Sequence, residues 1–202
     1  MIDEIKNILQ HEANSILKIP VNESFEQAVN LIYHRVHVKK GKIVASGMGK
    51  AGQIALNMAT TFSSTGTPAV FMHPSEAQHG DLGMLQENDV MILISNSGKT
   101  LEIIELTTLS NNLFNDIPFI LISSNTKSEL SEKAAVTIST GNPKEVCILG
   151  LTPTTSTTTM TVIGDILVVL LMKKVGFSNE DYAKRHHGGY LGILSRQKSN
   201  FK

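Results

Sequence analysis

Five short apolar segments that alternate with helical segments constrain this chain most strongly. Each apolar segment is nearly continuous, which is typical of strands buried on both faces of a parallel sheet. They lie at 42–46, 69–72, 90–94, 119–122 and 136–138. Apolar residues recur at helical spacing between them, at 50–63, 100–113 and 126–135. The alternation predicts an α/β protein, a doubly wound three-layer α/β/α sandwich around a five-stranded parallel sheet.

A chain of 202 residues fits one domain with a sizeable core. We expect a single domain that comprises two N-terminal helices over 2–37, a sandwich core over about 40–175 and a C-terminal segment over 176–202. A long apolar helix is predicted over 156–174, with Gly176 just past its end.

Helix-start signals occur twice. Ser24–Gln27 and Thr126–Glu129 have the spacing of capping boxes. The polar residues after Ser195 are expected to fray.

Composition limits the partners and the compartment. Lys and Arg number 18, as do Asp and Glu, so the formal net charge is zero and no cationic footprint for nucleic acid exists. Cys147 is the single cysteine, which favours a reducing compartment and a small buried residue over a nucleophile. The N-terminus lacks a signal peptide, and the apolar stretch 166–172 is too short to span a bilayer. We therefore expect a cytoplasmic protein with no membrane partner.

A glycine-rich turn follows the first strand. Gly47–Gly52 matches G-x-G-x-x-G, which alone is a weak signal. A dinucleotide site would require an acidic residue at the end of the next strand, but the nearest, Glu76, lies beyond Pro74. Two interpretations stay open: glycines that permit a tight turn, or a ligand-binding turn in which Lys50 presents a cation.

A hydroxyl-rich turn, Ser95–Thr100, follows the third strand and precedes a helix. It ends like a P-loop, but Leu93 stands where a Walker A loop needs glycine, which disfavours nucleotide triphosphates. Hydroxyls and unpaired N–H groups at a helix N-terminus bind phosphate well. Thr152–Thr158, before the last long helix, could complete the same pocket. Ordinary helix capping remains the alternative for both segments.

Acid and base candidates are scattered along the chain. Glu102 lies in the first turn of a helix, where it could simply complement the dipole, and Glu145 lies in a loop, where it could be a solvated charge. His186 follows a polar segment. His73 and His79 bracket Glu76, but no Cys/His spacing supports zinc, so no functional metal site is expected.

Several motifs together resemble the sugar isomerase (SIS) family and, within it, the arabinose 5-phosphate isomerases. The resemblance covers about residues 40–195 and indicates a flavodoxin-like or Rossmann-like fold. It is carried by Gly47–Lys50, Thr61–Pro68, His79–Met84, Ile94–Gly98, Leu149–Thr158 and His186-x-Gly188-Gly189-x-Leu191-Gly192.

The resemblance implies an aldose–ketose isomerase. Its members interconvert D-ribulose 5-phosphate and D-arabinose 5-phosphate without a cofactor, for synthesis of the sugar acid Kdo in lipopolysaccharide or capsule. Catalytic roles carry over to Lys50, Glu102, Glu145 and His186. Binding roles for the phosphosugar are expected for Gly49, Ser95, Asn96, Ser97, Thr100, His79, Thr154, Thr155, Ser156 and Thr157.

The reaction moves a proton between C1 and C2, so it needs a carbon base and a group that stabilises the enediolate. The sequence leaves open whether Glu102 or Glu145 is the base. His186 suits proton transfer on oxygen, since imidazole titrates near neutral pH. Two alternatives also stay open: an SIS isomerase of sedoheptulose 7-phosphate or a hexulose 6-phosphate, and a non-catalytic sugar-phosphate sensor.

The chain departs from its relatives at a few points. Many carry two cystathionine-β-synthase-type regulatory domains after the SIS domain, whereas this chain ends at Lys202, so we expect a short form without them. Lys99, His187 and Ile193 replace the residue types usual in the family. Abundant apolar helix surface, and site residues in segments that no strand fixes, predict an oligomer in which one subunit completes another's site, and the resemblance implies a homotetramer.

Overall fold

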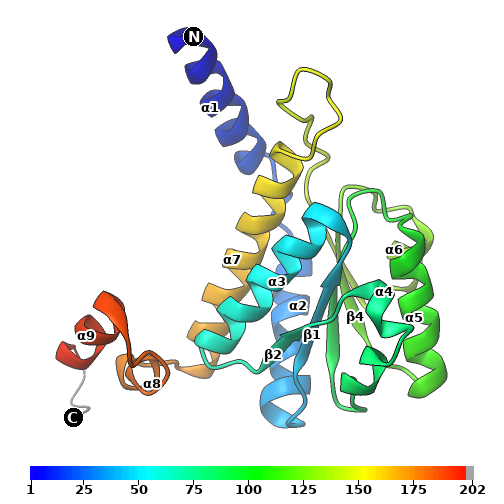
Figure 1. Ribbon diagram of the computed structural model, residues 1–202, viewed down its shortest axis with the longest axis vertical. Coiled ribbons are helices and arrows are strands. Elements are labelled where there is room, and N and C mark those ends of the chain that lie inside the picture. The colour runs from blue at the N-terminus through cyan, green and yellow to red at the C-terminus, as the bar shows by residue number, and fades with distance from the viewer. Residues whose placement is uncertain (199–202) are drawn as a thin grey trace.

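The computed structural model describes residues 1–198 and contains one sheet of five parallel strands (Figure 1). The order is β2-β1-β3-β4-β5, as in flavodoxin-like folds. The strands are β1 (Ile43–Gly47), β2 (Ala69–Phe71), β3 (Val90–Ile94), β4 (Phe119–Ser123) and β5 (Val136–Ser139). The predicted fold class is confirmed, because strands buried on both faces need helices on both sides.

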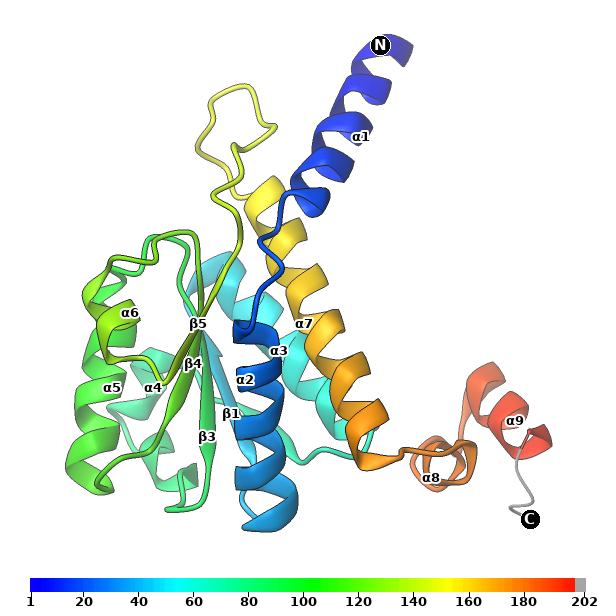
Figure 2. The same cartoon turned by 180° about the vertical axis from the view of Figure 1, so that it is seen from behind.

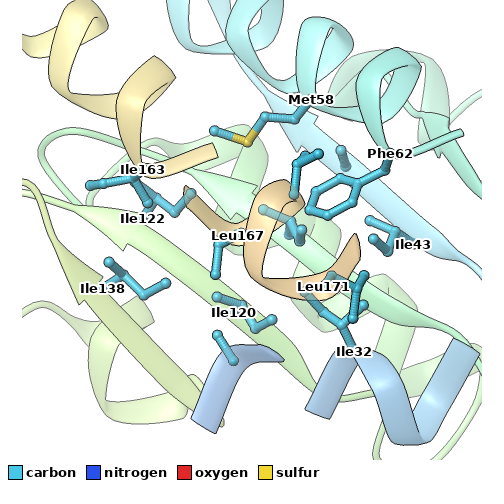
Figure 3. Close-up of a cluster of buried hydrophobic side chains, with 14 of the residues drawn as sticks. Ile32, Ile43, Met58, Phe62, Ile120, Ile122, Ile138, Ile163, Leu167 and Leu171 are labelled. Atoms are coloured by element: carbon cyan, nitrogen blue, oxygen red, sulfur yellow. The ribbon is translucent and has the colours of Figure 1, made fainter. Parts of the chain in front are cut away.

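Side chains alternate between the two faces of the sheet. On one face, Ile120 and Ile122 of β4 pack with Leu167 in a core beneath α2 (Ser24–Ile32), α3 (Gly49–Ser64) and α7 (Thr155–Val175) (Figure 3). On the other face, Leu93 and Leu121 pack with residues from α4 (Pro74–Ala77), α5 (Leu101–Leu113) and α6 (Glu129–Lys133). A short 3₁₀ helix, η2 (Asp81–Met84), follows α4.

Helix α7 is the longest element of the core. It lies against α3 so closely that a Cβ on Gly164 would come 2.6 Å from Met58 Cε. Among residues 1–198, α7 alone is long and apolar enough to cross a membrane by length and composition. Half of that stretch is buried inside the fold, as is typical of a core helix.

Three helices extend beyond the sandwich (Figures 1 and 2). Helix α1 (Ile2–Leu17) projects at the end where the loop over 140–154 also lies. Helices α8 (Asn179–Ala183) and α9 (Gly189–Gln197) form an arm at the opposite end of α7. Both regions carry exposed apolar side chains: Ile2, Ile5 and Leu9 on α1, and Tyr190, Leu191 and Ile193 on α9.

Helix boundaries differ from the sequence-based expectations at several points. The cap of α2 is Glu23, so the expected capping box at Ser24–Gln27 is wrong. After Ile32 the helix continues as a π-helix, η1 (Tyr33–Val38). The capping box expected at Thr126–Glu129 is also wrong, because the Ser128 hydroxyl accepts the Ser131 N–H and starts α6 there.

The C-terminal segment is more ordered than its polar sequence suggests. A capping box that joins Ser178 and Asp181 starts α8. Helix α9 continues past Ser195 to Gln197, where fraying was expected, and residues 199–202 lie outside the described part of the chain.

Candidate active site

A pocket of about 690 Å³ lies where β1 and β3 end at the carboxyl edge of the sheet. The strand order reverses between these two strands, which is where doubly wound sheets bind ligands. The volume suits a small ligand. The lining comes from the turns after both strands, the loop over 143–153 and the start of α7: Met48, Lys50, Ala51, Ile94, Ser95, Asn96, Ser97, Thr100, Pro143, Lys144, Glu145, Gly150, Leu151, Pro153, Ser156, Thr157 and Met160.

The glycine-rich turn packs closely on itself and also borders the pocket. A Cβ on Gly52 would lie 2.5 Å from the Gly47 carbonyl oxygen, so these two glycines allow close backbone packing. Gly49 adopts a φ of 56° at the start of α3. Lys50 lines the pocket with an exposed side chain, so the turn also brings a cation to the ligand space.

The hydroxyl-rich turn forms the floor of the pocket. Ser95 is 2% exposed, and its hydroxyl lies 2.8 Å from the Thr100 hydroxyl. The Lys99 N–H donates to Ser97 Oγ at 3.1 Å. Gly98 adopts a φ of 64°, which closes the loop against α6. Helix α5 starts directly after the loop, so its first N–H groups have no partner within the helix and can hold an anion.

Glu145 accepts three hydrogen bonds at the start of α7. The Thr154 N–H and hydroxyl donate to Glu145 Oε2 at 2.7 and 2.9 Å, and the Ser156 N–H does so at 3.2 Å. Burial raises the pKa of Glu145, but the hydrogen bonds from Ser156 and Thr154 outweigh it and lower the pKa below the ordinary value. The carboxylate is therefore ionised at neutral pH. All three of these bonds go to Oε2.

Several of the expected residues do not line the pocket. Thr155 is fully buried. Thr154 uses its hydroxyl on Glu145. Glu102 sits in the first turn of α5, beyond the last lining residue of that segment, and His79 lies exposed between α4 and η2. Gly49, which precedes Lys50, does not line the pocket either.

His186 lies far from the pocket of its own chain. Helix α7 runs between them, and its 21 residues span about 31 Å at 1.5 Å per residue. The imidazole stacks on Tyr182 with ring centroids 3.6 Å apart. Nδ1 lies 3.0 Å from the Tyr182 carbonyl oxygen. A carbonyl only accepts, so Nδ1 carries a proton and Nε2 of the neutral ring is the acceptor.

Lys144 is a pocket residue that the sequence analysis missed. Its position beside Glu145 was the available signal, because residues that flank a site residue in a loop often share the site. Met48, Leu151 and Met160 add apolar surface. Within residues 1–198, no group of three or more His, Cys, Asp or Glu side chains is placed to hold a metal ion.

A family model described as the SIS domain matches residues 37–170. The chain belongs to the SIS domain family. Among curated relatives, the arabinose 5-phosphate isomerase KdsD of Francisella tularensis is 46% identical over 184 residues, which are 91% of this chain and 55% of that protein. KdsD of Yersinia pestis is 45% identical over 93% of this chain and 56% of its own length. This SIS chain thus spans about half the length of the curated relatives it matches.

Solved SIS-like structures share the fold over nearly the full chain. A Bacteroides fragilis protein, described as a phosphosugar isomerase involved in capsule formation, is 63% identical with a TM-score of 0.93, and covers 94% of this chain and 99% of its own. An Escherichia coli CFT073 protein in complex with arabinose 5-phosphate is 34% identical with a TM-score of 0.81, and covers 91% of this chain and 95% of its own.

Proposed function

We propose that this chain is an aldose–ketose isomerase that interconverts D-ribulose 5-phosphate and D-arabinose 5-phosphate through an enediolate. The observation that carries the proposal is one pocket lined by the Ser95–Thr100 turn, Lys50 and Glu145. It joins an anion-binding turn to a cation and a carboxylate. The identity to KdsD proteins and the arabinose 5-phosphate complex of the 34% identical structure support the substrate.

The phosphate anchors the sugar and does not react. Ser95, Ser97 and Thr100, with the first N–H groups of α5, hold it, and Ser156 and Thr157 at the start of α7 also line the pocket. Fixing the phosphate places C1 and C2 beside the reacting side chains, which converts an encounter into an intramolecular step.

Glu145 is the carbon base in this proposal. It lines the pocket, whereas Glu102 does not. Its Oε1 removes the proton from C2 of the aldose and returns it to C1 to give the ketose, while the Lys50 ammonium offsets the charge that develops on the enediolate oxygens.

His186 transfers protons on oxygen and reaches the pocket of a second copy. Its Nδ1 donates to the Tyr182 carbonyl oxygen, so Nε2 is the ring nitrogen left for the substrate. About 31 Å of α7 separate it from its own pocket, and the α8–α9 arm that carries it extends away from the sandwich (Figure 2). The exposed apolar residues of α1 and α9 give two copies surface to bury. We therefore propose a homotetramer with shared sites.

The product feeds synthesis of Kdo for lipopolysaccharide or capsule, in the cytoplasm. The capsule-related Bacteroides fragilis protein, 63% identical, supports this assignment. Neither a cofactor nor a metal is part of the proposed mechanism.

NMR of purified protein tests the proposal. With D-arabinose 5-phosphate in D₂O, we expect D-ribulose 5-phosphate to form with deuterium at C1, and deuterium to enter C2 of the D-arabinose 5-phosphate that forms on reversal. Parallel assays with sedoheptulose 7-phosphate and hexulose 6-phosphate should run much slower. Binding of arabinose 5-phosphate without turnover or exchange would instead establish a sensor.

A further inference from the structure

Two consecutive residues of α1 contact the segments around Glu145: His11 contacts the loop that carries it, and Glu12 contacts the first residue of α7. His11 Nε2 lies 2.7 Å from the Lys144 carbonyl oxygen, so it donates a hydrogen bond to the residue before Glu145. Glu12 Oε1 accepts the Thr155 hydroxyl at 2.7 Å. These contacts join segments that are 133 and 143 positions apart in the sequence.

Thr155 hydrogen-bonds both to Glu12 and to Val146, the residue after Glu145. The Val146 N–H donates to Thr155 Oγ1 at 3.1 Å and to Thr154 Oγ1 at 3.3 Å. A hydroxyl has one proton, and Glu12 fixes its direction, which leaves the lone pairs of Thr155 Oγ1 for Val146. Thr155 is 0% exposed, so in the folded chain its hydroxyl donates to Glu12 and not to solvent.

The residues on both sides of Glu145 are thus tied to α1, one through His11 and one through Glu12 and Thr155. The Glu145 side chain itself is tied to the start of α7. We propose that Glu12 is a positioning residue for Glu145: it orients the Thr155 hydroxyl, which holds the Val146 amide and so fixes the backbone from which Glu145 reaches the pocket. The inference rests on the proposed role of Glu145 as the base.

Stability alone does not favour a carboxylate at this point. Glu12 Oε2 is buried and has no hydrogen-bond partner within residues 1–198. Burying a charged group with one of its two oxygens unpaired is unfavourable, and an apolar residue of similar volume would avoid that penalty. A positioning role explains the carboxylate, because only an acceptor can direct the Thr155 proton.

Four variants of the full chain test the role: Glu12→Ala, Glu12→Gln, Thr155→Val and the control Glu4→Ala, an exposed glutamate on the same helix. We expect Glu12→Ala and Thr155→Val to lower kcat about 10- to 100-fold, the scale of a displaced catalytic group, with a smaller change in KM. Glu12→Gln keeps an acceptor oxygen and should recover most of the kcat. Glu4→Ala should behave as the parent protein.

Two further readouts separate positioning from a general loss of structure. The acid limb of the kcat profile should move to higher pH in Glu12→Ala and Thr155→Val, because a loosened loop weakens the hydrogen bonds that keep Glu145 ionised. Amide hydrogen exchange should speed up in residues 144–150 and stay unchanged in β3 and β4.

The outcomes distinguish this inference from the proposed function. Unchanged kcat, acid limb and loop exchange in Glu12→Ala and Thr155→Val, with an inactive Glu145→Gln, would overturn the positioning role alone. Full activity of Glu145→Gln would overturn the base assignment. Should Glu12→Ala fail to fold, Thr155→Val, which preserves the side-chain shape, and Glu12→Gln decide the question by the same readouts.

Discussion

Gly98 tests how tightly the proposed phosphate-binding turn is packed. Its φ of 64° is unfavourable for an L side chain, and a Cβ there would lie 2.2 Å from Ser128 Oγ and 2.6 Å from Ser128 Cβ. Gly98→Ala therefore combines a backbone cost of about 1–2 kcal/mol with overpacking of about 1–3 kcal/mol. We expect the free energy of unfolding to fall by about 2–5 kcal/mol.

A second substitution isolates the packing part. Ser128 caps α6, and Ser128→Gly removes both contacting atoms while weakening the cap by only about a few tenths of a kcal/mol. In the double variant Gly98→Ala/Ser128→Gly only the backbone cost should remain, so the two changes should couple by about 1–3 kcal/mol.

Urea denaturation at one protein concentration measures the coupling between the two substitutions. Steady-state kinetics measure how well the turn still binds the sugar phosphate. KM for the sugar phosphate should rise in Gly98→Ala, because Ser97 and Thr100 flank the displaced residue, and should partly recover in the double variant. If the loss of unfolding free energy in the double variant equals the sum of the two single losses within about 0.5 kcal/mol, the contact between this turn and α6 is refuted.

Three further outcomes are expected. Glu145→Gln should lower kcat about 100-fold or more. Because its hydrogen bonds lower the pKa of Glu145, the acid limb of wild-type kcat/KM assigned to this carboxylate should lie below the ordinary glutamate value; a limb above that value would contradict the geometry. His186→Ala should be similarly impaired, and refolding it together with Glu145→Gln should restore activity, because some mixed sites contain both functional side chains; no restoration would contradict shared sites. Asp89→Ala should reduce the free energy of unfolding by about 3 kcal/mol in urea titrations, since the fully buried Asp89 carboxylate pairs with the Lys42 ammonium at 2.6 Å; a loss under about 1 kcal/mol would show that the pair contributes little.

The sheet was predictable because its signal is local. Val90–Ile94 is apolar at every position, and both faces of β3 are indeed covered. Helix ends were less predictable. Ser24 has capping-box spacing, yet Glu23 takes the cap position, whereas Ser178 and Asp181 form a capping box of the same type that was overlooked.

The pocket was partly predictable because some of its lining residues also have a local sequence signal. Lys50, Ser95 and Ser97 follow strand ends, and the carboxyl ends of parallel strands share one edge of the sheet. The Glu12–Thr155 contact crosses 143 positions, and nothing in either local sequence announces it. Likewise, the position of His186 depends on the direction in which the arm leaves α7, which no local pattern encodes.

Helix α7 sets the distance between the pocket and the arm that carries His186 within one chain. Thr155 begins α7 beside the pocket and Gly176, in a left-handed turn, ends it where the arm departs. Inserting a single residue between them would swing the arm by about 100° and advance it by about 1.5 Å. In the proposed shared site, the residue count of α7 therefore sets how far the arm of one copy reaches toward the pocket of its neighbour.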